Sequence, residues 1–332
     1  MTPSNTTKSN FSRGYLIGLA SAAILSTTAI FIRYLTQTTL IPPLVLAFWR
    51  DVFVILTLLL VFGIFRRHLL RIDRRFLRFF ILYGLVLAAF NSLWTLSVAF
   101  NGAAVATVLA YCSAAFTAIL GWRLFKERLD WAKIVVIAAC LGGCALVAGA
   151  LDPTAWSKNP IGILTGVLSG LGYAVYSLMG RSASQRGLNP WTTLLYTFSF
   201  ATVFLLVVNL LPGSFLPGAA SQPRDLFWLG ENLAGWGILF LLAAGPTVAG
   251  FGLYNVSLGY LPASVANLVV TSEPVFTSVI AYLLLGERLS PIQIVGSLMI
   301  IGGVVFLRIY EGRMAGRNEL DVQPVLYETT PP

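Results

Sequence analysis

Apolar residues in this chain come in long runs that short polar or charged segments separate. A helix needs about 20 mostly apolar residues to cross the hydrocarbon layer, because it rises about 1.5 Å per residue and the layer is roughly 30 Å thick. The runs therefore predict ten transmembrane helices. They lie near residues 14–33, 43–65, 77–98, 103–122, 132–150, 161–180, 191–211, 235–257, 263–284 and 291–308.

Polar segments flank these runs at both ends of the sequence. Residues 1–13 form a polar N-terminal segment, which we place in the cytoplasm, and the polar residues 309–332 are expected to be a disordered cytoplasmic tail. The first apolar run is longer than the 7–15 residues of a secretory signal. We therefore interpret it as the first span and not as a cleaved signal.

The composition agrees with a membrane protein. Of the 332 residues, 57% are hydrophobic and 11% are charged, whereas globular domains carry roughly 25% charged residues. The three Cys form no CxxC pair, so neither a disulfide framework nor a cysteine metal site is predicted. The single His lies in a loop and the sequence has no GxxxxGK[ST] motif. We expect no enzyme, no cofactor, no metal and no ATP-driven pump.

The placement of the basic residues explains the net charge of +9. With the N-terminus in the cytoplasm, 17 of the 22 Lys and Arg fall on the cytoplasmic side and 4 on the other. This asymmetry is typical of proteins that follow the positive-inside rule. It predicts a multi-pass protein of the cell membrane with both termini inside, whose charged partner is the lipid bilayer and not nucleic acid.

The second half of the chain repeats the first. A shift of 160 residues aligns 105–143 with 265–303, including Glu127-Arg128-Leu129 with the same three residues at 287–289. Residues 14–150 then form one five-helix repeat and residues 161–308 the other. Because five is odd, the repeats cross the membrane in opposite directions, as in secondary transporters with a substrate site at the repeat interface. The predicted fold is an all-α integral membrane protein of two inverted repeats.

The second repeat carries motifs that identify a family resemblance. They are Tyr260-Leu261-Pro262-Ala263-Ser264, Glu273-Pro274-Val275-Phe276, Leu285-Gly286-Glu287-Arg288-Leu289, Gln293, Gly296 and Gly302-Gly303. With them the chain resembles the drug/metabolite transporter superfamily, in its ten-helix, EamA-like branch. The first half departs, with Ser113-Ala114 in place of Glu273-Pro274. The resemblance implies a carrier that exports amino acids, metabolites or toxic compounds without ATP.

Ionisable residues deep in a span are costly and are functional candidates by default. Arg50 and Asp51 lie in the second span and Glu273 lies in the ninth. Arg50 is predicted to hold a substrate carboxylate, with maintenance of the fold by an Arg50–Asp51 pair as the alternative. Glu273 precedes Pro274, which predicts a helix kink. Glu273 and Asp51 are candidates for proton coupling or for a structural role.

Other polar or aromatic residues lie within the predicted spans, at positions where a membrane helix is normally apolar. With Arg50, the predicted substrate-binding residues are Asn91, Trp94, Tyr111, Tyr176, Tyr254, Asn255, Asn267 and Thr271. Interhelical hydrogen bonding is the alternative for each of them. Helical spacing shows that they cannot all face one cavity.

These patterns predict a secondary transporter that exports a small organic metabolite, such as an amino acid or a related compound, by alternating access. The alternative is an ion or divalent-cation channel, whose selectivity filter is built from rings of carboxylates or carbonyls. The sequence is compatible with a monomer or a homodimer.

Overall fold

The computed structural model describes residues 3–101, 103–147, 149, 160–211, 218–285 and 290–320. Within these ranges every regular element is a helix, as the apolar runs predict. The first half contains α1 (Pro3–Leu25), α2 (Thr28–Thr39), α3 (Pro43–Phe65), the short η1 (Arg67–Leu70) and η2 (Arg74–Phe76), α4 (Leu77–Asn101), α5 (Ala103–Tyr111), α6 (Ser113–Phe125) and α7 (Trp131–Val147). The second half contains α9 (Pro160–Gln185), α10 (Pro190–Leu210), the short η3 (Pro223–Phe227), α11 (Leu233–Leu242), the π-helix η4 (Ala243–Thr247), α12 (Val248–Tyr260), α13 (Ala263–Val270), α14 (Glu273–Leu285) and α15 (Pro291–Leu320).

The helices fall where the ten apolar runs place them. In the described residues, eight helical segments are long and apolar enough to cross a membrane, and α7 is a shorter apolar helix of 17 residues. The ninth run, near 263–284, forms α13 and α14 with a break between them. The protein is therefore an all-helical, multi-pass membrane protein.

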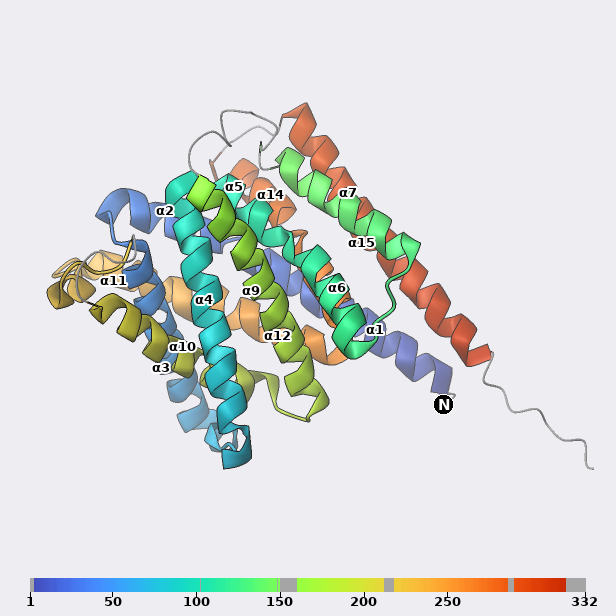
Figure 1. The fold of residues 1–332 in the computed structure, drawn as a ribbon, viewed down its shortest axis with the longest axis horizontal. Coiled ribbons are helices and arrows are strands. Elements are labelled where there is room, and N and C mark those ends of the chain that lie inside the picture. Colours follow the sequence, from blue (N-terminus) through green and yellow to red (C-terminus); the bar gives the residue numbers. More distant parts are fainter. Residues whose placement is uncertain are drawn as a thin grey trace, which may run out of the picture.

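The two halves pack with a symmetry that exchanges them (Figure 1). α4 lies along α9, and the pair that corresponds to it when the halves are exchanged, α12 and α1, also lies side by side. α7 packs on its own counterpart α15, and α3 packs on α10. Exchanging the two halves therefore turns each of these packed helix pairs into another packed pair or into itself. A duplicated five-helix unit produces this pattern.

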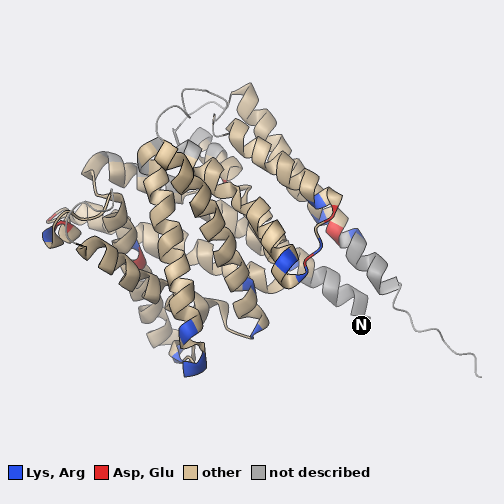
Figure 2. Ribbon diagram, viewed as in Figure 1, with Lys and Arg blue, Asp and Glu red and all other residues tan. Residues whose placement is uncertain are grey.

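The bundle has two distinct ends. We name one the basic face, formed by residues 66–76, 126–130, 181–189 and 258–262, which are loops and the helix ends beside them. Hydrogen bonds tie the first of these segments to the start of α10: Thr192 Oγ1 and Tyr196 Oη donate to the carbonyls of Leu69 and Leu70, at 2.9 and 2.8 Å. Lys and Arg residues gather at the lower ends of the helices in Figure 2, which show this face. At the other end, α2 meets α3, and we name it the cavity face.

Glycines bring α7 and α15 into close contact. A Cβ atom added to Gly143 would lie 2.6 Å from the carbonyl oxygen of Gly296, and one added to Gly296 would lie 2.6 Å from that of Gly143. Larger residues at either position would force the helices apart.

The C-terminal helix corrects one expectation. Residues 309–320 continue α15 instead of beginning a disordered tail. The physical reason is contact with α7 and the loop before it: Tyr310 Oη donates to Asp130 at 2.8 Å, and Glu311 forms a 3.2 Å ion pair with the buried Lys133. Residues 321–332 of the predicted tail lie outside the described residues.

Candidate substrate site

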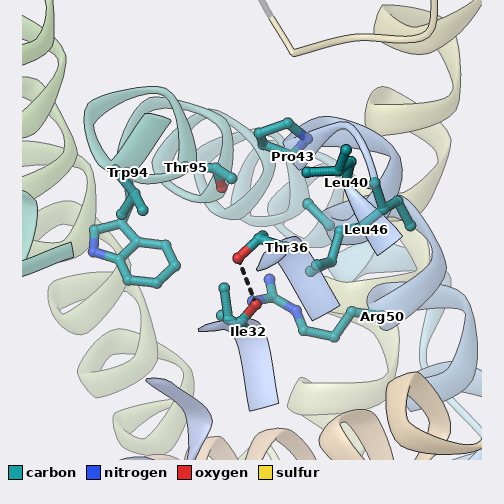
Figure 3. Close-up of a pocket in the computed structure, with 11 residues that line it drawn as sticks. Ile32, Thr36, Leu40, Pro43, Leu46, Arg50, Trp94 and Thr95 are labelled. Atoms are coloured by element: carbon teal, nitrogen blue, oxygen red, sulfur yellow. Dashed lines mark hydrogen bonds between the residues drawn. The ribbon is translucent and has the colours of Figure 1, made fainter. Parts of the chain in front are cut away.

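A cavity of about 280 Å³ lies between α2, α3 and α4 at the cavity face (Figure 3). The residues that line it are Ile32, Thr36, Leu40, Ile41, Pro43, Leu46, Ala47, Arg50, Trp94, Thr95 and Val98. Leu40 is 72% exposed, so it marks the open end. Ligand pockets commonly hold roughly 300–1,000 Å³, so this cavity has the size for a small metabolite.

Arg50 is the charged residue among the described residues that line the cavity. Its Nη2 lies 3.3 Å from Oδ1 of Asp51, and both side chains are buried. Asn91 lies beside the same carboxylate. Asp51 neutralises the guanidinium, whose planar fork still presents further N–H donors. In Figure 3 the guanidinium reaches toward Ile32 and Thr36.

Trp94 contributes an aromatic ring to the part of the wall that α4 forms. Its ring stands across the cavity from Leu40 and Leu46 in Figure 3. The hydroxyl of Thr95, one residue on, donates to the Asn91 carbonyl of its own helix. Of the nine residues predicted to bind substrate, the structure places Arg50 and Trp94 at this cavity.

Two of the other predicted residues, Asn267 and Tyr254, lie deeper, in a polar network between the repeats. Ser113 Oγ donates to Asn267 Oδ1 at 2.9 Å, and Asn267 Nδ2 donates to Ser177 Oγ at 3.1 Å. Ser177 shares a 2.6 Å hydrogen bond with the Tyr254 hydroxyl. This series of hydrogen bonds runs through α6, α13, α9 and α12, so it joins both repeats. Asn267 and Tyr254 are thus interhelical bonding residues in this conformation.

Aromatic rings close the bundle below this network, toward the basic face. The Tyr83 and Tyr176 rings lie 4.9 Å apart, and Tyr83 also contacts Phe79 at 5.7 Å. Tyr176 Oη donates to Asn255 Oδ1 at 3.3 Å. Tyr176 and Asn255 therefore pack in the closed part of the protein, away from the cavity.

Two spans are interrupted by consecutive hydroxyl residues. Between α1 and α2, Ser26 and Thr27 donate their hydroxyls to the carbonyls of Ala23 and Ile24. The second interruption, between α13 and α14, is built in the same way, with hydrogen bonds that run Thr271 to Leu268 and Ser272 to Val269. Each hydroxyl thereby finds an acceptor within its own helical turn, as a buried polar group in an apolar interior requires.

The two interruptions touch each other, because Thr277 Oγ1 of α14 donates to the Ser26 carbonyl at 3.3 Å. The kink predicted at Pro274 is present as the break before α14. Discontinuous helices near the middle of the bundle are typical of secondary transporters.

Glu273 begins α14 and points to the other repeat. Its Oε2 accepts a 2.8 Å hydrogen bond from the Tyr111 hydroxyl of α5. Within the part of the chain that the structure describes, no ion pair involves Glu273. Tyr111 and Thr271, both predicted to bind substrate, thus belong to the helix breaks, where Tyr111 holds Glu273.

Sequence reasoning missed several residues that matter here. Thr36 lines the cavity because α2 turns after the break at Ser26, and a run of apolar residues gives no sign of such a turn. It also missed Glu127 and Arg181, which were assigned to loops and topology alone. The described residues hold no group of three or more His, Cys, Asp or Glu side chains that could bind a metal ion.

The sequence model of the EamA-like transporter family matches the chain twice, over residues 12–149 and 160–309. The chain belongs to the EamA-like transporter family. The two matches coincide with the two halves that exchange in the fold. As a member of this family, the protein is a membrane transporter of small molecules and not an enzyme.

Relatives of this EamA-like chain are named as transporters. An uncharacterized transporter of Synechocystis sp. is 29% identical over 71% of this chain and 68% of its own. The threonine/homoserine exporter RhtA of Salmonella typhimurium is 29% identical over 66% of this chain and 67% of its own. The comparisons give no support to the channel alternative.

A solved crystal structure has the same fold. It superposes with a TM-score of 0.71, covering 91% of this chain and 99% of that one. At 16% identity the likeness concerns the fold alone.

Proposed function

We propose that this EamA-like transporter exports a small zwitterionic metabolite, an amino acid or a related compound, by alternating access. The observation that carries the proposal is the buried Arg50–Asp51 pair at an otherwise mostly apolar cavity. Arginine binds carboxylates through two parallel hydrogen bonds. In this function Arg50 holds the substrate carboxylate, and the apolar wall receives its carbon chain.

The charge balance of the pair favours a zwitterion over an anion. Arg50 and Asp51 together carry no net charge, and both are buried. A net charge added to a site of low dielectric is expensive unless it is paired. A solute with one carboxylate and one ammonium adds no net charge. The name of the exporter RhtA supports an amino acid as the solute and export as the direction.

Alternating access accounts for the unequal ends of the bundle. The cavity face is open at Leu40, whereas the basic face is closed by packed rings such as those of Tyr83 and Tyr176. The distribution of Lys and Arg supports a cell-membrane orientation with the basic face and both termini in the cytoplasm. In that orientation the cavity opens outward, and transport requires a second state that opens inward.

Glu273 is the residue we propose for proton coupling. It is a carboxylate between the two repeats that accepts a hydrogen bond from the neutral hydroxyl of Tyr111. An unpaired charge is costly in such a place, and a proton is a cation that neutralises it without a further side chain. Coupling by Glu273 would let a proton gradient drive the change of state.

Counterflow in liposomes tests the proposed function. Purified protein is reconstituted and loaded with a panel of amino acids, nucleosides and organic acids, and exchange of labelled solute is measured. We expect exchange of one or more neutral amino acids and less exchange of organic anions. A steady ionic current without exchange of any solute would overturn the carrier.

Variants of Arg50 separate binding from maintenance of the fold. Arg50→Lys keeps a cation beside Asp51 but loses the planar fork. We expect its KM to rise by about 10-fold or more, since hydrogen bonds to a charged group contribute roughly 1.5–3 kcal/mol. The double variant Arg50→Gln/Asp51→Asn removes both charges and so leaves neither unpaired. If this double variant folds and transports with an unchanged KM, Arg50 does not bind substrate.

A further inference from the structure

A carboxylate from the first repeat holds the start of a helix in the second. Oε1 of Glu127 accepts from the backbone N–H of Ala263 at 2.9 Å, and Oε2 accepts from the N–H of Ser264 at 3.3 Å and from the Ser264 hydroxyl. Glu127 follows α6, and it lies 136 positions from Ala263 in the sequence. The contact therefore crosses from one repeat to the other.

An arginine holds the end of the preceding helix. Nη1 of Arg181 donates to the carbonyls of Leu258 and Gly259, at 2.7 and 3.2 Å. These carbonyls end α12, just before the hairpin turn that leads to α13. A helix presents partial negative charge at its C-terminus and partial positive charge at its N-terminus. Arg181 and Glu127 each match the helix end that they contact.

The hairpin is also fitted closely to its neighbours. A Cβ atom on Gly14 of α1 would lie 2.7 Å from Cγ of Leu261 in the turn. A Cβ atom on Gly121 of α6 would lie 2.8 Å from Oε2 of Glu127. The glycines thus leave the room that the turn and the carboxylate occupy. Glu127 is positioned by packing as well as by its hydrogen bonds.

We propose that Glu127 and Arg181 form a latch that keeps the basic face shut while the cavity face is open. The latch comprises these two side chains and residues 258–264, which they hold. It rests on the proposed alternating access, since a cavity open at one face needs the other face sealed. Inward opening separates Glu127 from α13, so the latch sets the ratio of the two states.

Distance measurements between spin labels test the latch without any substrate. Labels are placed at Arg123→Cys, at the end of α6, and at Tyr260→Cys, at the hairpin, after Cys112, Cys140 and Cys144 are replaced by Ala. Arg123 and Tyr260 are exposed, so the labels should fit without displacing the core. In the otherwise unaltered protein we expect one predominant short distance.

Glu127→Ala should add a population at longer distance. We expect the ratio of closed to open states to fall by about 10-fold or more, because each hydrogen bond to a charged group contributes at least roughly a tenfold bias. Ser264→Ala should shift the ratio less, because both backbone contacts of Glu127 remain. The matched control is Asp73→Asn, a carboxylate of the same face that pairs with Arg75 and does not contact the hairpin. The control should leave the distances unchanged.

A folded Glu127→Ala protein with the distance distribution of the control would overturn the latch. If Glu127→Ala does not fold, Arg181→Gln is measured by the same criterion. The result is independent of the liposome panel. Solute exchange together with unchanged distances in Glu127→Ala refutes the latch alone, whereas altered distances without any exchange refute the proposed function alone.

Discussion

The fourth and ninth spans are broken at equivalent places but by different residues. In the ninth span, α14 begins with Glu273-Pro274 after Thr271 and Ser272. In the fourth, α6 begins with Ser113-Ala114 after Cys112. A shift of 160 residues aligns the two breaks. Proline ends a helix because it lacks an N–H and crowds the preceding turn. The break at Cys112 has no proline, so proline is not required for it.

Packing against α9 gives a reason for the break at Cys112. A Cβ atom on Gly170 would lie 2.9 Å from the Leu109 carbonyl oxygen and 3.3 Å from the Ser113 nitrogen. The backbone of α9 therefore sits directly on the interrupted turn. The comparison teaches that the duplicated architecture keeps the break, while the residues that produce it have diverged.

The two breaks also reach across to each other with different chemistry. Ser113 donates to Asn267 of α13, and Tyr111 donates to Glu273 of α14. The first connection joins neutral groups, and the second ends on a carboxylate. We expect the second to carry more of the stability and the pH response of the protein.

The largest effect is expected from proline within α6. Ala118→Pro should destabilise the protein by about 3 kcal/mol or more, since it removes a hydrogen bond inside the helix and its ring clashes with the preceding turn. Ala114→Pro, which copies Pro274 into the first turn of α6, should cost clearly less because helices accept proline there. Thermal unfolding in detergent measures both. Equal melting temperatures for the two variants would show that the break does not determine where proline is tolerated.

A smaller effect is expected at Glu273. Glu273→Ala leaves the buried Tyr111 hydroxyl without its acceptor, at a cost of about 1–3 kcal/mol. Glu273→Gln keeps an acceptor for Tyr111 and should retain most of the stability, but it cannot bind a proton. Its solute exchange in liposomes should therefore no longer depend on pH.

The matched control for this variant is Tyr111→Phe, which removes the hydrogen bond and keeps the carboxylate. Its melting temperature should fall while its transport still depends on pH. Unchanged pH dependence in a folded Glu273→Gln protein would exclude Glu273 as the proton site and leave it a structural residue.

The smallest effect is expected at Ser113. Ser113→Ala removes the neutral hydrogen bond to Asn267, for which we expect a loss of about 1 kcal/mol in the free energy of unfolding. Thermal unfolding compares it directly with Glu273→Ala. A loss at Ser113 that equals or exceeds the loss at Glu273 would contradict the unequal weight assigned to the two connections.

The sequence predicted much of the fold because lipid imposes simple rules. A span must be long, apolar and helical, so ten runs and the 160-residue repeat located the helices and the duplicated halves. The kink at Pro274 was also predictable from the local sequence, because proline lacks an N–H and interrupts a helix. The break at Cys112 was not, because it depends on the contact with Gly170, which is far away in the sequence.

The candidate site was predictable only in part. Arg50 stood out because charge is rare at depth, and it does line the cavity. Tyr176, Tyr254 and Asn267 stood out in a similar way, as polar residues in apolar spans. They nevertheless hydrogen-bond to neighbouring helices. A polar residue in a span needs a partner, and the sequence does not say whether that partner is a helix or a solute.

The sequence by itself determined which segments are helices, that the chain is a duplicated membrane transporter, and which few charged residues lie at depth. These properties follow from the energy of placing each residue in lipid, which is largely local. The tertiary structure alone decided which polar residues meet, as when Glu127 reaches Ser264 and Tyr111 reaches Glu273. Such meetings depend on which helix faces turn toward each other, and that is set by packing between segments more than 100 residues apart.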